Sequence, residues 1–301
     1  MTRKCLVLAL CLLPFCQAYG QDVEPRRWTP VPLGVSVFGA GYANTTGDIL
    51  FEPVLQLEDV EFDAHTLGVS YVRSFSLAGK SARFDALLPW QSIEWTGLLQ
   101  GEPAAAKRVG LADPRVRLSV ILFGPPAMEA PELRSYMAAR PVQTTVGAGV
   151  SVSVPWGEYH EDKLLNLGQN RFTVRPQLGV VHTRGPWSYE LTGSTFVFSD
   201  NDDFYGESKL EQDPLHAVQG HVIRIFKPGL WASIGAAYAW GGRNTLDGEK
   251  RNKRTEFLSA LSVGFPIGRR QGIKIAYLRS ETRENTGSDN NTLAIAWNVR
   301  Y

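Results

Sequence analysis

Segments of about ten residues in which apolar and polar side chains alternate recur along the chain from residue 33 onward. In residues 145–156, for example, valine, alanine and tryptophan fill the even positions, and mostly small or polar residues fill the odd ones. Successive side chains of a β-strand point to opposite faces, so this period of two predicts strands with one apolar face. No stretch after the first twenty residues has the roughly 18 apolar residues of a membrane-spanning helix. The pattern therefore predicts an all-β fold.

The alternating segments number twelve, and the gaps between them are short and long in turn. The predicted strands are residues 33–43, 65–76, 81–92, 114–123, 144–156, 171–183, 187–198, 216–226, 230–240, 254–265, 271–280 and 292–301. An even number of antiparallel strands, joined by short turns at one end and long loops at the other, is typical of bacterial outer-membrane barrels. One gap that should be short, 124–143, is long and predicts a short helix at Pro131–Tyr136. Ile49–Leu57 is expected to extend the strands on either side of it beyond the membrane.

The first twenty residues have the layout of a secretory signal peptide. Arg3 and Lys4 precede the apolar run Cys5–Phe15, and small residues follow at Ala18 and Gly20. Eleven apolar residues cross only about half of a bilayer core, which disfavours a membrane anchor. We therefore expect residues 1–20 to direct export, residues 21–32 to form an N-terminal periplasmic segment and residues 33–301 to form the barrel.

All three cysteines, at positions 5, 11 and 16, lie within this predicted signal peptide. The exported chain would then hold no disulfide, no thiolate metal site and no cysteine nucleophile.

Aromatic residues mark the ends of the predicted strands. The last strand alternates from Thr292 and stops at Tyr301, an ending common in outer-membrane barrels and read by their assembly machinery. Aromatic rings at strand ends predict girdles at the two membrane interfaces, in contact with lipid and lipopolysaccharide. A soluble β-sandwich would have the same pattern in each strand. The signal peptide, the aromatic ends and the alternating gaps favour the barrel.

If the apolar faces meet lipid, the polar faces point into the lumen. The charged residues on those faces are seven cations and two carboxylates: Arg83, Asp85, Arg115, Arg117, Arg171, Arg175, Glu190, Lys274 and Arg300. Gln177, Gln219 and His221 join them as hydrogen-bonding partners along the expected solute pathway. A basic lumen would favour anionic solutes. Alternatively, the arginines pair with carboxylates and fill a narrow barrel.

Enzyme, metal and nucleic-acid motifs do not explain the chain. It has no G-x-S-x-G elbow, H-E-x-x-H or Walker motif, and no two histidines lie at i, i+4 spacing. His221 near Ser194 or Ser233 could in principle serve a hydrolase, a weaker interpretation than lumen hydrogen bonding. A net charge of +1 gives no support to nucleic-acid binding. We predict no catalytic residues, no metal and no cofactor.

The acidic loop segments Asp200–Asp203 and Glu158–Asp162 lack the spacing of an EF-hand. They predict a solvated loop surface that contacts divalent cations of the lipopolysaccharide layer.

Several stretches together resemble one family of outer-membrane transporters, labelled "putative meta-pathway of phenol degradation". They are residues 36–42, 47–53, 112–119, 162–171, 200–206, 219–221, 231–233 and 241–248, and the resemblance spans about residues 33–300. The resemblance implies uptake of aromatic or other hydrophobic compounds and brings no catalytic residues.

Together these observations predict a twelve-stranded, antiparallel, up-and-down transmembrane β-barrel that carries small solutes passively across the outer membrane. The alternatives are an outer-membrane lipid-modifying enzyme and a closed structural barrel with a filled lumen.

Overall fold

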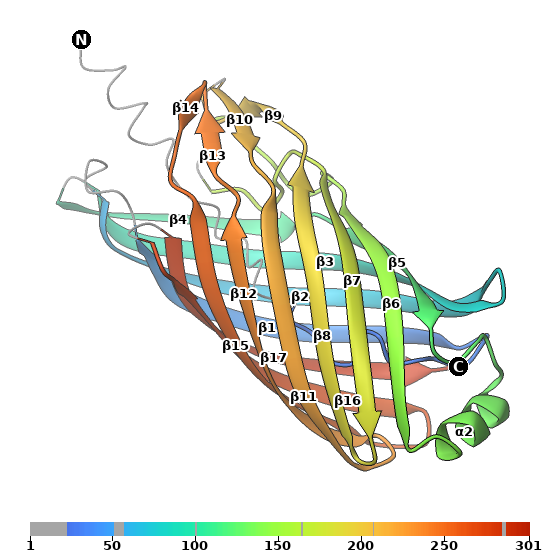
Figure 1. Ribbon diagram of the computed structural model, residues 1–301. Coiled ribbons are helices and arrows are strands. Elements are labelled where there is room, and N and C mark those ends of the chain that lie inside the picture. The colour runs from blue at the N-terminus through green and yellow to red at the C-terminus, as the bar shows by residue number, and fades with distance from the viewer. Residues whose placement is uncertain (1–22, 51–56, 100, 164, 207, 285–286) are drawn as a thin grey trace.

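Twelve long antiparallel strands form a closed barrel (Figure 1). The computed structural model describes residues 23–50, 57–99, 101–163, 165–206, 208–284 and 287–301, so the predicted signal peptide lies outside the described residues. The strands are β1 (Ser36–Leu50), β2 (Leu57–Leu77), β3 (Lys80–Leu99), β5 (Arg115–Phe123), β6 (Val142–Ser153), β7 (Thr173–Arg184), β8 (Trp187–Phe198), β11 (Leu215–Lys227), β12 (Leu230–Gly241), β15 (Arg254–Pro266), β16 (Gln271–Thr282) and β17 (Gly287–Arg300). The sheet closes where β1 pairs with β17. The predicted fold class and number of strands are confirmed.

One further strand, β4 (Glu102–Leu111), shares a barrel position with β5. Residues 90–99 of β3 pair with β4, and residues 82–87 of β3 pair with β5. Ala112–Pro114 connect β4 to β5. The other short strands, β9 (Asn201–Phe204), β10 (Ser208–Gln212), β13 (Asn244–Leu246) and β14 (Glu249–Lys250), form a small sheet from two of the long loops.

The turn end of the barrel carries tight hairpins and one helix. Ala78 and Gly79 link β2 to β3 with φ values of 49° and 76°, the left-handed backbone of a two-residue hairpin turn. Helix α2 (Ala130–Ala138) lies at the same end (Figure 1), where the sequence predicted a short helix. No helix in the described part of the chain is long and apolar enough to cross a membrane.

The outer face of the barrel is apolar at mid-height, and the inner face is polar. A row of exposed side chains crosses five neighbouring strands in register: Tyr189, Val222, Ile234, Leu261 and Tyr277. The residues adjacent to this row on β8 and β11, Glu190 and His221, are buried inside. This arrangement agrees with the predicted lipid-facing and lumen-facing sides.

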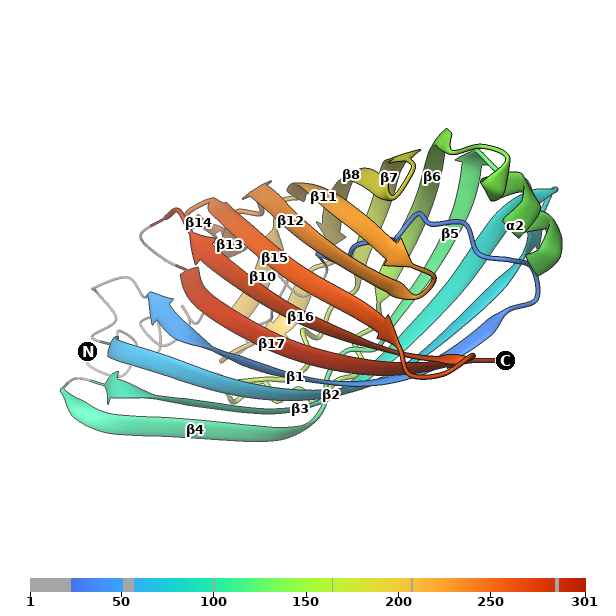
Figure 2. The same cartoon turned by 90° about the horizontal axis from the view of Figure 1, so that it is seen from below.

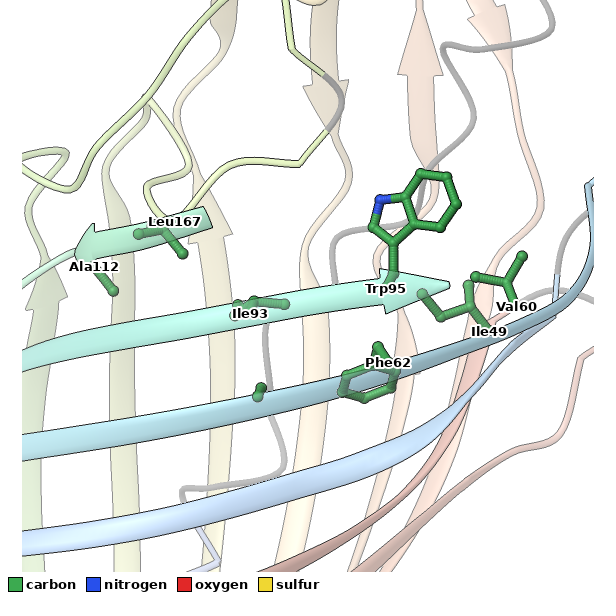
Figure 3. Packing of buried hydrophobic residues seen from close by; sticks show 8 residues of the cluster. Ile49, Val60, Phe62, Ile93, Trp95, Ala112 and Leu167 are labelled. Atoms are coloured by element: carbon green, nitrogen blue, oxygen red, sulfur yellow. The ribbon is translucent and has the colours of Figure 1, made fainter. Parts of the chain in front are cut away.

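Beyond mid-height, β1 to β4 continue past the rest of the barrel as a curved flap, here called the extension (residues 45–50, 59–66, 91–99 and 102–110; Figure 2). In the extension, apolar side chains face inward and charged side chains face outward, the reverse of the arrangement at mid-height. Val60 and Phe62 face inward and are buried, whereas Glu61 and Asp63 face outward and are exposed. The inward residues form an apolar cluster with Ile49, Ile93, Trp95, Ala112 and Leu167 (Figure 3). β1 and β2 do extend as predicted, although residues 51–56 lie outside the described part.

Candidate functional site in the barrel lumen

The segment that precedes β1 lies inside the lumen, against the inner face of the wall from β16 to β6. At one end of the segment, Val23 packs on inward side chains of β12, β15 and β16, including Ala237, Leu258 and Ala276. At the other end of the segment, the Trp28 Nε1–H donates to Thr192 Oγ1 on β8 at 2.8 Å. Figure 2 shows this segment running inside the ring of strands. We call residues 23–28 the strap.

Paired glycines hold the Trp28 ring against the barrel wall. Gly147 on β6 and Gly179 on β7 face each other in register. A Cβ would lie 2.3 Å from a Trp28 ring carbon at Gly147, and 1.9 Å from Trp28 Nε1 at Gly179. Any other residue would displace the indole, so these glycines form the slot in which the strap rests.

Three of the predicted lumen residues anchor the strap. The Glu190 carboxylate accepts the backbone N–H of Arg26 at 2.8 Å and of Arg27 at 3.0 Å. The Gln177 side-chain oxygen accepts a hydrogen bond from the Arg27 guanidinium at 2.5 Å. Lys274 Nζ lies 3.1 Å from Glu24 Oε1. Sequence reasoning placed the anchors inside the barrel but missed the strap itself, because residues 21–32 show no period-two pattern and were expected on the periplasmic side.

A second group of predicted residues lines the β3–β5 wall. Asp85 pairs with Arg83 at 3.1 Å and with Arg117 at 3.0 Å, and Arg115 lies on the same inward face as Arg117. Arg300, by contrast, is exposed at the end of β17. Pairing therefore accounts for part of the excess of cations in the lumen, as the filled-barrel alternative proposed.

Higher in the lumen, two buried arginines lie over phenylalanine rings of the adjacent strand. The Arg171 guanidinium is 4.6 Å from the centre of the Phe198 ring, and that of Arg175 is 4.3 Å from the Phe196 ring. Arg171 also donates to the side-chain oxygens of Gln169 and Gln212. These cation–π contacts place aromatic rings directly beside two of the cations of the lumen.

The remaining two predicted residues, Gln219 and His221, face inward from β11. His221 pairs across the sheet with Glu190 and Gly235, whereas Ser194 and Ser233 stand opposite other residues. Neither ring nitrogen of His221 has a hydrogen-bond partner in the described chain. The arrangement holds no nucleophile and base in contact at His221.

A hollow of about 680 Å³ in the wall beside His221 is lined mainly by outward-facing side chains, among them Tyr189, Ile234 and Tyr277.

The open end of the barrel is shaped by a loop tied back to the wall. Asp113 accepts the backbone N–H of Gly157 at 3.0 Å and of Gln169 at 2.8 Å, and Leu167 of this loop is buried in the cluster of the extension. Burial raises the pKa of the Asp113 carboxyl, and the two N–H donors oppose that shift.

The acidic residues of the loops are partly paired. Lys209 lies within ion-pair distance of Asp200, Asp202 and Glu211. Among the described residues, no group of three or more His, Cys, Asp or Glu side chains could hold a metal ion.

The fold and its interior define a transmembrane β-barrel with a polar lumen that holds its own N-terminal segment. Residues 33–295 match the sequence profile of the family described as "Putative MetA-pathway of phenol degradation", and the chain belongs to this family.

The structure is similar to the crystal structure of an outer membrane channel from Pseudomonas putida F1. The TM-score is 0.77 and the sequence identity 20%, over 93% of this chain and 100% of the other. The transport unit of the autotransporter AIDA-I from Escherichia coli matches with a TM-score of 0.52 and 6% identity, over 88% of this chain and 90% of the other. No curated protein matches the chain significantly in sequence.

Proposed function

We propose that the protein is an outer-membrane channel for the passive uptake of small solutes, aromatic or other hydrophobic compounds among them. The observation that carries the proposal is a closed barrel whose polar lumen holds a strap, attached to the inner wall through hydrogen bonds and an ion pair. The paired strands enclose a lumen through which a solute could pass, and the strap narrows that lumen. Membership of a family named for phenol degradation supports the solute class, and the fold is shared with an outer membrane channel.

The same proposal places the chain in the bacterial outer membrane. Residues 1–20 would direct export, and the assembly machinery would read the strand that ends at Tyr301. The exposed apolar row at mid-height would contact lipid, and the charged loops would contact lipopolysaccharide.

The strap can be tested by recording single-channel currents from the mature protein in a planar bilayer. Trp28→Ala removes the ring from its glycine slot and the hydrogen bond to Thr192, so we expect conductance to rise several-fold. The matched control is Trp90→Ala, on the exposed outer face, which should conduct like the wild type. Silence from wild-type and Trp28→Ala proteins that are both shown to be folded would mean a closed structural barrel and would overturn the proposal.

The charge of the lumen can be tested with a salt gradient on the same proteins. Because Arg115 and Arg117 face inward, replacing both with Glu should shift the reversal potential toward cation preference. Lys107→Glu with Arg279→Glu changes the net charge equally on outward-facing, exposed positions. An equal shift in both double variants would remove Arg115 and Arg117 from the solute pathway.

A further inference from the structure

Two neighbouring side chains on the inner face of β11 are buried with unused hydrogen-bonding atoms. His221 is 4% exposed and Gln219 is 3% exposed. Neither Nδ1 nor Nε2 of His221, nor the Nε2 of Gln219, has a hydrogen-bond partner in the described chain. Buried polar groups are nearly always paired, and leaving one unpaired costs about 1–3 kcal/mol. Two such side chains on one strand face therefore point to a ligand.

The residues opposite the pair on β12 are small, and the histidine ring lies against the backbone of one of them. Gly235 stands opposite His221, and a Cβ at that position would lie 2.2 Å from His221 Nδ1. Gln219 stands opposite Ala237, and Ala260 follows on the next strand beyond Gly235. The polar atoms thus lie beside small apolar side chains, on which Val23 of the strap also packs.

Charge and hydrogen-bonding capacity narrow the chemical class of the ligand. Arg27, Lys274 and Glu24 act electrostatically on the His221 ring, and Glu190 is its partner on β8. Groups of both signs therefore surround the ring, so the site does not offer a ligand a set of charges of one sign. An imidazole offers one donor and one acceptor, and the Gln219 amide nitrogen offers donors. A neutral hydroxyl, which both donates and accepts, matches this set.

We infer that His221 and Gln219 form a binding site for the hydroxyl group of a neutral solute, whose apolar part takes the place of Val23 against the small residues of β12 and β15. The hydroxyl donates to the unprotonated ring nitrogen of His221 and accepts a hydrogen bond from Gln219 Nε2. The inference rests on the proposed function, since it places a recognition site beside the strap within the solute path.

Phenol and anisole form the matched pair of probes, because they share the ring and only phenol has a hydroxyl donor. The folded mature protein, labelled with ¹⁵N in its histidine rings, is titrated with each compound. We expect phenol to shift the ring-nitrogen resonance of His221 and to bind about fivefold more tightly than anisole, the size expected for one net hydrogen bond. His221→Phe identifies the resonance and should abolish the difference between the probes.

Two further variants test the site without replacing His221 itself. Gly235→Ala leaves both polar side chains in place but pushes the His221 ring aside, so phenol binding should weaken. Gly193→Ala is the control, since no atom lies within 4 Å of its added Cβ. Equal effects of phenol and anisole on His221, or binding that Gly235→Ala leaves unchanged, would overturn the site.

Single-channel recordings of the same preparations separate this inference from the proposed function. Conducting channels that do not discriminate phenol from anisole would overturn the site alone. Phenol binding by a folded but silent barrel would support the site and overturn the channel.

Discussion

The barrel wall at mid-height and the extension are made from the same strands, but they bury opposite faces. On β2, Leu67 and Val69 point outward at mid-height and are 57% and 46% exposed. A few residues earlier on the same strand, Val60 and Phe62 point inward and are 3% and 6% exposed. At mid-height the apolar side chains face lipid, whereas in the extension they pack against one another.

This contrast locates the edge of the membrane on the strand. Where the outer solvent is hydrocarbon, apolar residues face out; where it is water, charged residues such as Glu61 and Asp63 do so. β3 changes in the same way, from outward Trp90 to inward Ile93 and Trp95. The alternation thus shifts by one residue at the level where the surrounding medium changes.

The largest expected effect is in the extension. Phe62→Ala leaves a cavity in the cluster of Figure 3, and such losses cost about 3–5 kcal/mol. We expect amide hydrogen exchange to speed up in the extension while the wall amides stay protected. Leu67→Ala, on the same strand but facing outward, is the control. Faster exchange throughout the barrel would show that the two regions unfold as one unit.

A charge on the lipid-facing surface should have the next largest effect. Ile234 is 59% exposed near the middle of β12, and Ile234→Arg should lower the free energy of unfolding by about 2–4 kcal/mol. Urea unfolding in lipid vesicles measures this change. An unaffected midpoint would argue that this face does not meet hydrocarbon.

A smaller effect is expected at Asp113, whose hydrogen bonds hold the loop of residues 157–170 against the wall. Asp113→Asn keeps one carbonyl acceptor and loses the charge, so one of the two backbone hydrogen bonds from Gly157 and Gln169 weakens, at about 1–2 kcal/mol. Proteolysis within residues 157–170 should accelerate while the wall stays intact. Asp63→Asn, exposed on the outer face of the extension, should leave that rate unchanged.

The smallest effect is expected for Glu61→Arg. This side chain is exposed on the outer face of the extension, where substitutions change stability by about 0.5 kcal/mol or less. Measured beside Ile234→Arg under the same urea conditions, it contrasts the two outer faces directly. A loss as large as that of Ile234→Arg would place the extension inside the bilayer.

The twelve barrel strands could be predicted from alternation, because at membrane height one face of every strand meets lipid, although the pattern breaks at Arg73 in one predicted strand and at Ile223 in another. The second predicted strand began at residue 65, whereas β2 begins at Leu57, because the alternation shifts where the sides are exchanged. Inward residues such as Gln177, Glu190 and His221 followed from the same periodicity. The strap did not, because its contacts depend on the Gly147–Gly179 slot and on carboxylates far away in the sequence.

The strap also constrains the order in which the chain can fold. Its hydrogen bonds to Gln177, Glu190 and Thr192 join residues 150–164 positions apart. Closing loops of that length carries an entropy term of roughly 4–5 kcal/mol, so β6, β7 and β8 must be assembled before these contacts become favourable. Val23 also needs β12, β15 and β16, so the residues just before the first strand reach their native places only after strands far along the chain have been assembled.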